Sequence, residues 1–238
     1  MDGRVPPLRL RLNNHSSTSP WFYLLMSLFL LTLITILFLR SPLSKLEKIE
    51  IGGNKLISDQ EILKRIRFVK GISYFHFSPS EARRALETLP ELKEVEIKKS
   101  FPNQVYIQVQ EHPIIALWLT REQKLIPLLA NGFALKKVSV TNIGAKPIVQ
   151  GWDSLNPVAV LALKQFALLP KELQEEITSI QPAPYASDQV LLISKKRHYI
   201  FVRAHELLKK VKLYSSFKNH PSGKIYLLES IWFAPEKM

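Results

Sequence analysis

The chain has 238 residues, of which 46% are apolar and 22% charged, and its 33 Lys and Arg against 20 Asp and Glu give a net charge of +13. Eight glycines and no cysteine exclude a collagen-like polymer and a disulfide scaffold, and the length is enough for one or two domains with a real core. A chain this basic usually has nucleic acid, an anionic membrane surface or an acidic polymer as its neighbour, and the position of the charges decides among them.

An uncharged apolar stretch near the N-terminus predicts a transmembrane helix. Residues 21–39 read WFYLLMSLFLLTLITILFL and include 13 Leu, Ile or Phe, and no charged residue lies between Arg11 and Arg40. Nineteen residues at about 1.5 Å each span about 28 Å, close to the hydrocarbon core of roughly 30 Å. Insertion of these 13 side chains contributes on the order of 4 to 8 kcal/mol. Trp21 and Tyr23 lie at one end, as in an aromatic belt.

Two other interpretations of this stretch are a buried core helix and a cleavable signal peptide. A core helix would have a polar face, which is absent here. A signal peptide has a shorter apolar stretch and a small-residue cleavage site, whereas Arg40-Ser41-Pro42-Leu43 follows this one. Arg4, Arg9 and Arg11 in the tail favour a cytoplasmic N-terminus, so the C-terminal part of the chain is expected outside the cell membrane.

The segment after the anchor predicts a strand followed by two capped helices. Lys45 to Ile51 alternates between polar and apolar residues, and Gly52-Gly53-Asn54 ends this strand as a turn. Ser58-Asp59-Gln60-Glu61 is a capping-box pattern at the start of one helix. Ser78-Pro79-Ser80-Glu81 starts the next, with Ser at the cap and Pro at the first helical position.

Two alternating strands, at residues 94–98 and 104–110, follow the helix pair and are joined by a tight turn at Phe101-Pro102-Asn103. The order strand, helix, helix, strand, strand predicts an α+β unit of about 70 residues, in which two short helices cover one face of a three-stranded sheet.

This unit resembles a POTRA domain, and a single POTRA domain directly after one transmembrane helix resembles the FtsQ/DivIB family of bacterial division proteins, with the DivIB branch the nearer. The segments that carry the resemblance are Lys48 to Asn54, Val95 to Asn103 and Val105 to Pro113. POTRA domains also occur in envelope assembly and secretion proteins, so an assembly or secretion module is the alternative.

The distal half predicts a β-rich domain with a few helices, an arrangement similar to the second domain of FtsQ and DivIB. A turn is expected at Asn131-Gly132, and helices are expected from Asn156-Pro157 onward and from about His205 to Lys218. Strands are expected at residues 114–119, 125–129, 177–181, 189–194, 198–202 and 224–228, with further short strands toward Val149.

The expected organisation is therefore a cytoplasmic tail over residues 1–20, a transmembrane helix over residues 21–39, a POTRA domain over residues 43–113 and a β-rich distal domain over residues 114–238.

The positive charge gathers in the distal half, where residues 114–238 carry 17 Lys or Arg against 9 Asp or Glu. A run of charge is usually a solvated face, but it also fits attraction to lipid headgroups or acidic wall polymer. Nucleic acid is not expected as a partner outside the membrane. The residues of this predicted anionic-surface patch are Lys195, Lys196, Arg197, Arg203, Lys209, Lys210 and Lys212.

Motifs for catalysis are absent from the sequence. There is no Gly-x-Ser-x-Gly, no His-Glu-x-x-His and no Gly-rich phosphate loop. The histidines, at 15, 76, 112, 198, 205 and 220, fall in separate predicted elements, and each is predicted to be a surface or partly satisfied side chain. We therefore expect no catalytic residue, cofactor or metal, although an envelope enzyme or a regulator of a cell-wall enzyme remains the rival function.

The resemblance implies a non-catalytic scaffold that promotes assembly of the division complex at the septum by binding two bitopic coiled-coil division proteins, FtsL and the one called DivIC or FtsB. The family would bind them by β-addition, in which the last strand of the sheet pairs with a strand of the partner. An ordinary final strand packed within the sheet is the alternative. The matching residues here are Lys224, Ile225, Tyr226, Leu227, Leu228 and Glu229.

Overall fold

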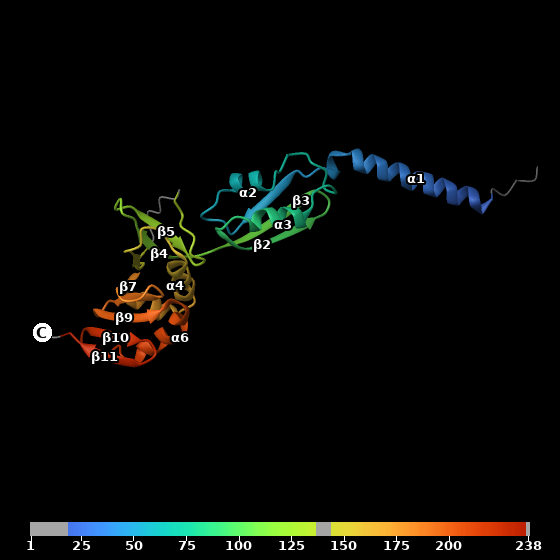
Figure 1. Cartoon of the computed structure of the whole chain (residues 1–238). Coiled ribbons are helices and arrows are strands. Elements are labelled where there is room, and N and C mark those ends of the chain that lie inside the picture. The colour runs from blue at the N-terminus through green and yellow to red at the C-terminus, as the bar shows by residue number, and fades with distance from the viewer. Residues whose placement is uncertain (1–18, 137–143, 237–238) are drawn as a thin grey trace, which may run out of the picture.

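The computed structural model describes residues 19–136 and 144–236, so the predicted tail, residues 1–20, lies almost wholly outside the described residues. The described chain forms a long helix, then a small proximal unit (residues 42–112) and a larger distal unit (residues 113–236), one after another along the molecule (Figure 1). This confirms the predicted fold class: an α+β protein with an N-terminal apolar helix, a unit of the POTRA order and a β-rich second part.

The predicted apolar helix forms as α1 (Pro20–Arg40), and none of its residues is buried. Among the described residues it is the one helix that is long and apolar enough to cross a membrane. The hydroxyls of Ser27, Thr32 and Thr35 each donate to a carbonyl oxygen three or four residues earlier, at 2.8 Å. These polar side chains are thus satisfied inside the helix and do not oppose its placement in hydrocarbon.

The proximal unit is a three-stranded sheet with two helices on one face (Figure 1). β3 is the central strand, paired in parallel with β1 and antiparallel with β2. The elements in chain order are the 3₁₀ turn η1 (Pro42–Ser44), β1 (Lys48–Gly52), α2 (Asp59–Arg65), α3 (Pro79–Glu87), β2 (Leu92–Ser100) and β3 (Gln104–Glu111).

Both predicted helix caps form. The Ser58 hydroxyl accepts the Glu61 N–H at 3.2 Å, and the Ser78 hydroxyl accepts the Glu81 N–H at 3.4 Å. The alternation of β2 and β3 turns one set of side chains toward the helices and closes a core of its own, whose most deeply buried members include Leu46, Ile62, Leu86, Val105 and Ile107.

A carboxylate fastens the end of β3 to the loop between β1 and α2. One oxygen of Glu111 accepts the backbone N–H groups of Lys55, Leu56 and Ile57 at 3.0, 2.9 and 3.1 Å, and the other accepts Leu56 again at 3.0 Å. Since an N–H that loses water must find another acceptor, this clamp lets the loop fold down against the sheet.

The distal unit is an eight-stranded mixed sheet in the order β11-β10-β9-β8-β7-β6-β4-β5. Its strands are β4 (Ile114–Leu119), β5 (Leu125–Leu129), β6 (Ile148–Val149), β7 (Ile177–Pro182), β8 (Gln189–Ser194), β9 (His198–Arg203), β10 (Gly223–Leu227) and β11 (Ile231–Pro235). Its helical segments are α4 (Pro157–Ala167), α5 (Lys171–Glu176), η2 (Ala204–Glu206), α6 (Leu207–Lys210) and η3 (Val211–Ser216).

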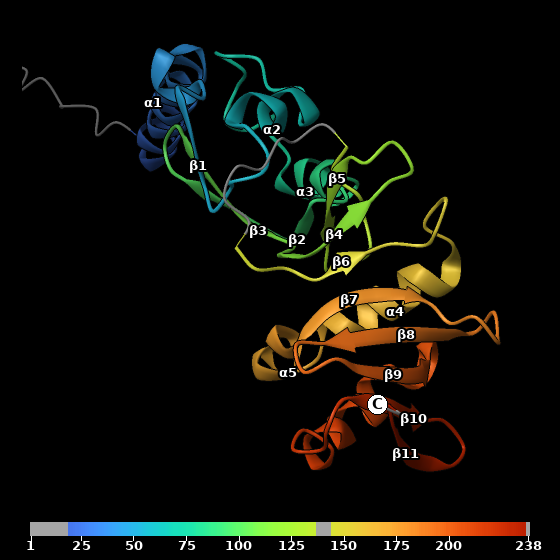
Figure 2. The same cartoon turned by 90° about the vertical axis from the view of Figure 1, so that its left-hand side faces the viewer.

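The helices α4 and α6 cover one face of this sheet, and the opposite face of β7 to β10 carries no helix (Figures 1 and 2). The core between the sheet and the helices is apolar, and its fully buried members include Leu163, Phe166, Leu192, Ile200, Val211, Ile225 and Leu227. Because side chains alternate along a strand, the neighbours of these β residues lie on the uncovered face.

The distal prediction needs three corrections. The expected single helix from His205 to Lys218 is divided into η2, α6 and η3, because the 3₁₀ spacing of three residues places both Val211 and Tyr214 in the core. The short helix α5 and the strand β11 were not predicted. Of the expected short strands before Val149, only β6 forms among the described residues, and residues 137–143 lie outside them.

Candidate partner-binding site

The predicted edge strand is wrong in its position. β10 (Gly223–Leu227) is paired in parallel with β9 on one side and antiparallel with β11 on the other, so it offers no open edge. Ile225 and Leu227 are buried in the core, Lys224 and Tyr226 lie on the uncovered face, and Leu228 and Glu229 belong to the turn that follows. The chain reverses at this turn and adds β11, which becomes the outermost strand.

The missed strand has a signal in the sequence. Residues 231–235 read IWFAP, and an apolar, aromatic run of this kind after the polar pair Glu229-Ser230 is typical of a strand. A proline at its end also fits an edge position, since an edge strand can do without one N–H group.

The alternation of an antiparallel ladder shows which backbone groups of β11 are free. The Glu236 N–H donates to the Ser222 carbonyl at 3.1 Å, so even-numbered residues bond toward β10 and odd-numbered ones point away from it. No described segment pairs with that open side. The groups left there are the N–H and C=O of Ile231, the N–H and C=O of Phe233, and the C=O of Pro235.

A row of aromatic rings leads to this edge across the uncovered face. Trp232 on β11 stacks on Tyr226 of β10, with ring centroids 4.1 Å apart and planes 10° apart. Tyr226 in turn stacks on Phe201 of β9, with ring centroids 4.9 Å apart, and the Tyr185 ring centroid lies 6.5 Å from that of Phe201. Trp232 is 49% exposed, so the row ends in an accessible indole beside the free backbone groups.

The covered face holds the edge in place through a buried histidine. His198 is fully buried; its Nδ1 lies 2.9 Å from the Tyr214 hydroxyl, and its Nε2 lies 2.9 Å from the Pro221 carbonyl oxygen. Because a carbonyl only accepts, Nε2 carries the proton and Nδ1 accepts from Tyr214, whose pKa is raised by burial. Phe233 packs on His198 and His220. The prediction of a surface or partly satisfied histidine is therefore wrong for His198.

The other end of the sheet is less open. The outer side of β5 is occupied by the chain that follows it, where the Leu129 N–H donates to the Phe133 carbonyl at 2.9 Å and the Leu135 N–H donates to the Pro127 carbonyl at 2.9 Å. Of the two outer strands of the distal sheet, β11 is thus the one with a continuous row of free groups among the described residues.

The predicted anionic-surface patch does not form one surface. Lys195, Lys196 and Arg197 make up the exposed turn between β8 and β9, whereas Arg203 lies at the other end of β9. Arg203 is paired with Glu229 at 3.0 Å and lies 3.7 Å from Asp188. Lys209 and Lys212 are exposed on the helical segments, and Lys210 there is paired with Glu206 at 2.9 Å and bonds the Leu228 carbonyl.

Carboxylates offset more of this charge than the sequence predicted. The Lys218 ammonium lies 2.8 Å from Glu176 and holds the pKa of that carboxyl below its ordinary value, with Lys195 and Lys196 adding to the effect. Lys210 lowers the pKa of Glu206 in the same way. Among the residues of the predicted patch, Lys209, Lys212 and the three cations of the β8–β9 turn stay exposed without a carboxylate of the described residues within ion-pair distance, and the turn is where three of them are adjacent.

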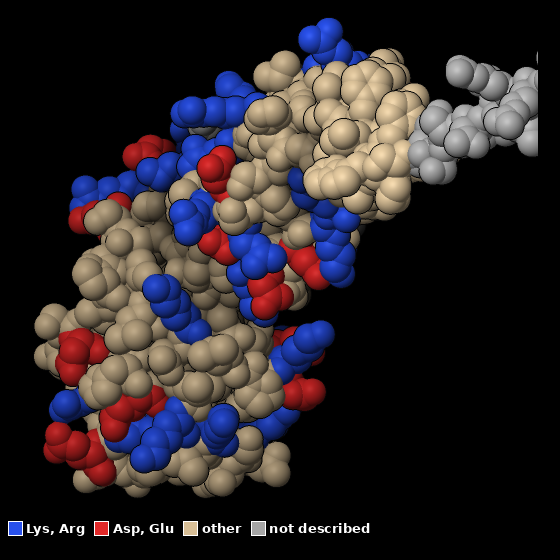
Figure 3. Space-filling model, turned by 90° about the vertical axis from the view of Figure 1, so that its right-hand side faces the viewer, with Lys and Arg blue, Asp and Glu red and all other residues tan. Residues whose placement is uncertain are grey.

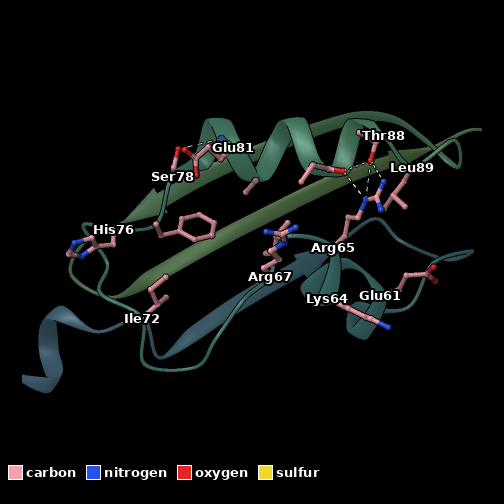
Figure 4. Close-up of a pocket in the computed structure, with 14 residues that line it drawn as sticks. Glu61, Lys64, Arg65, Arg67, Ile72, His76, Ser78, Glu81, Thr88 and Leu89 are labelled. Carbon is pink, nitrogen blue, oxygen red and sulfur yellow. Dashed lines mark hydrogen bonds between the residues drawn. The ribbon is translucent and has the colours of Figure 1, made fainter.

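A groove of about 720 Å³ lies between α2 and α3 in the proximal unit (Figure 4). Arg65 from α2 crosses it and donates from Nε to the Ala85 carbonyl at 3.2 Å and to the Thr88 hydroxyl at 3.0 Å. The guanidinium therefore joins the two helices. In the described part of the chain, no group of three or more His, Asp or Glu side chains lies close enough to hold a metal ion.

Known proteins are similar to the chain in both parts. Residues 44–112 match the family model described as "POTRA domain, FtsQ-type". The cell division protein DivIB of Brevibacillus brevis is 26% identical over 239 residues, which cover 98% of this chain and 90% of that protein. DivIB of Geobacillus kaustophilus is 26% identical over 242 residues, covering 99% and 91%. The resemblance predicted from the sequence is thereby confirmed.

Among the solved structures that are similar is the major extracytoplasmic domain of DivIB from Geobacillus stearothermophilus, in its trans isomer. It is 21% identical, with a TM-score of 0.38, over 46% of this chain and 98% of that one.

Proposed function

We propose, on the premise that the chain is a protein of the FtsQ/DivIB family with an FtsQ-type POTRA domain, that it is a non-catalytic, membrane-anchored scaffold of the bacterial division complex. The observation that carries the proposal is the free edge of β11, held on a folded domain at the far end of an apolar helix. Relatives that match nearly the whole chain are named cell division proteins.

In this proposal the partner binds by β-addition at β11, the outer strand, and not at β10, where the sequence predicted the edge. An extended segment of the partner would pair with the free N–H and C=O groups of Ile231 and Phe233, which gives affinity without reading sequence. The adjoining Trp232 and Tyr226 rings would contact the partner's side chains and so select among partners, since an exposed indole fills a small apolar pocket well. The partners we expect are bitopic division proteins of the FtsL and DivIC or FtsB type.

The proposed location is the cell membrane at the division septum, with the N-terminus inside and both folded units outside. The apolar helix α1 and the arginines that precede it in the tail support this orientation. Residues 1–20, 21–39, 43–113 and 114–238 then serve as tail, membrane span, POTRA domain and partner-binding domain.

A fluorescent fusion tests the role in division. We expect the full chain fused at its N-terminus to gather at the septum of dividing cells and to copurify with FtsL-type and DivIC-type proteins. A diffuse envelope signal together with copurification of secretion machinery would favour the assembly or secretion alternative instead.

A pair of substitutions at one residue tests the edge. Ile231→Pro removes an N–H from the open side and places a ring there, whereas Ile231→Ala removes only a 47% exposed side chain. We expect capture of the partner to fall at least about tenfold for Ile231→Pro, equivalent to about 1.4 kcal/mol, and to change little for Ile231→Ala. Equal capture by both variants would contradict β-addition at β11.

The three cations of the β8–β9 turn support a second, weaker contact with an anionic envelope surface, either lipid headgroups or wall polymer. Neutralising Lys195, Lys196 and Arg197 together should weaken association with anionic vesicles at low salt more than at high salt. Unchanged association with the vesicles at both salt concentrations would contradict this contact.

A further inference from the structure

Four aromatic side chains gather where α1 enters the proximal unit. Phe38, in the last turn of α1, stacks on Phe101 with ring centroids 5.8 Å apart, and its centroid lies 6.4 Å from that of Phe75. Tyr74 contacts both Phe75 and Phe101, at 5.5 and 6.2 Å. We call Phe38, Tyr74, Phe75 and Phe101 the aromatic collar.

The collar contains two large side chains that the protein leaves open. Phe75 is 52% exposed and Phe101 is 67% exposed, whereas Tyr74 beneath them is 9% exposed. Both exposed phenylalanines contact Phe38 of the apolar helix, so together with that helix they form an apolar surface of the kind that marks an interaction site.

Both loops of the collar are tied to the chain that leaves α1. The Tyr74 N–H donates to the Ser44 carbonyl and the Leu46 N–H to the Ile72 carbonyl, each at 2.8 Å. The Glu47 N–H donates to the Asn103 carbonyl at 3.2 Å, which holds the turn of Phe101. These backbone bonds fix Phe75 and Phe101 beside the end of the helix.

The base of the collar is rigid as well. The ammonium of Lys99 donates to the Tyr74 and Phe77 carbonyls at 2.6 and 3.1 Å and lies 4.2 Å from the centroid of the Tyr74 ring. At the helix end, the Ser44 hydroxyl donates to the Leu39 carbonyl at 2.7 Å. The path from helix to unit is therefore short and hydrogen-bonded throughout, unlike a flexible tether.

The length of α1 fixes the depth of the collar. A helix of 21 residues is about 31 Å long, which matches the hydrocarbon core of roughly 30 Å, so Arg40 lies at the boundary of the bilayer. Phe38 is two residues before Arg40 and hence about 3 Å deeper along the helix axis. Side chains whose rings contact Phe38 would therefore lie at the boundary between headgroups and acyl chains, where aromatic side chains are favoured.

Basic side chains lie around this end of the molecule. Seen from the α1 side, Lys and Arg flank the apolar helix over the proximal unit (Figure 3). Arg40 ends the helix, and Lys45, five residues later, forms a β-bridge with Ser73 next to the collar. Cations at this level face lipid phosphates, so charge and apolar surface point to the same occupant.

We propose that the proximal unit docks on the bilayer that α1 spans, with the side chains of Phe75 and Phe101 inserted at the boundary between headgroups and acyl chains. The occupant of the collar is the phospholipid itself. Docking holds the proximal unit at a fixed height and tilt, and so presents the β11 edge at a defined distance from the membrane. The inference rests on the membrane anchoring proposed for α1, and the experiment separates the two.

The absence of cysteine makes every single-cysteine variant a clean labelling site. Nitroxide labels would be placed at Phe75→Cys and Phe101→Cys in the full chain, reconstituted in vesicles of phosphatidylcholine and phosphatidylglycerol. Leu31→Cys in α1 is the control inside the bilayer, and Tyr185→Cys, at a 78% exposed aromatic of the distal unit, is the matched control in water. Power saturation compares access of apolar oxygen with access of a water-soluble nickel chelate.

We expect labels at 75 and 101 to favour oxygen over the chelate, as the Leu31 control does, and the label at 185 to favour the chelate. Labels at 75 and 101 that behave like the one at 185, with the Leu31 label still in lipid, would overturn the docking and leave the anchor intact. A Leu31 label in water would overturn both.

A second measurement follows the consequence of docking. The double substitution Phe75→Ser and Phe101→Ser should shift and broaden the distance from a dye at Tyr185→Cys to an acceptor in the membrane, measured by energy transfer in the full chain. The control is Tyr106→Ser, at an aromatic of β3 that is 39% exposed and outside the collar. A distance distribution that is unchanged by the double substitution would contradict the proposal.

Discussion

The Glu111 clamp is the most concentrated electrostatic feature of the proximal unit, and its removal has a calculable effect. In Glu111→Ala, the N–H groups of Lys55, Leu56 and Ile57 lose their acceptor together. The Lys55 N–H is exposed and can turn to water, but Ile57 is only 4% exposed and Leu56 is half-buried. Two N–H groups thus stay without full compensation.

A hydrogen bond to a charged acceptor contributes about 1.5 to 3 kcal/mol, and a buried donor left unpaired costs about 1 to 3 kcal/mol. Two such groups predict that Glu111→Ala lowers the free energy of unfolding of the proximal unit by about 2 to 6 kcal/mol. Glu111→Gln keeps one acceptor oxygen and turns an NH₂ group toward donors, so a smaller loss is expected.

Native-state hydrogen exchange on the full chain in detergent micelles measures the protection of the amides that the Glu111 carboxylate accepts. Protection of the amides at residues 56 and 57 should fall first, followed by protection of β1 and β3. Glu50→Gln is the matched control, because that carboxylate is exposed and pairs only with Lys48 on its own strand. The reasoning fails if Glu111→Ala leaves amide protection at 56 and 57 within the range of the control.

Three further outcomes are expected. Gly53→Ala should cost about 1 to 3 kcal/mol or more in thermal unfolding, because φ is +88° and the new Cβ would lie 2.0 Å from a backbone oxygen of β3; a neutral result would contradict the strain. His198→Leu should cost about 1 to 3 kcal/mol for each partner left unpaired, and Tyr214→Phe less, because it breaks only one of the two bonds; equal losses in urea titrations would contradict a contribution from the bond to the Pro221 carbonyl. Lys218 lowers the pKa of Glu176 in the folded state, so this ion pair stabilises the fold above pH 4.5, and its contribution is lost as the pH falls through the lowered pKa. Glu176→Gln should therefore weaken the dependence of the free energy of unfolding on pH at acid pH. An unchanged pH dependence would contradict the pairing.

Most of the elements could be predicted from local signals, because these signals act within a few residues. Ser58 and Ser78 mark the starts of two helices, because each hydroxyl accepts the backbone N–H of the residue three positions later, and both of these caps form. The alternation of β2 and β3 works in the same way, since each side chain's face depends only on its parity along the strand.

The prediction failed where one local sequence pattern is compatible with two different structures. The stretch from His205 to Lys218 has helical spacing, but contact with the buried His198 draws Tyr214 inward and selects 3₁₀ geometry for part of it. The seven distal cations looked like one patch in sequence, yet β9 separates Arg197 from Arg203 by the length of a strand, and carboxylates from other elements pair with Arg203 and Lys210.

Sequence by itself determined the apolar helix, the α+β order of the proximal unit, the resemblance to a division-protein family and the absence of catalytic motifs, because composition, periodicity and capping are short-range properties. Tertiary structure alone decided which strand is the edge, since the neighbour of a strand is set by contacts between distant segments. The free backbone groups lie at Ile231–Pro235, whereas the sequence predicted them at residues 224–229. It also brought Phe75 and Phe101 against Phe38 in the last turn of α1, although these residues are far apart along the chain.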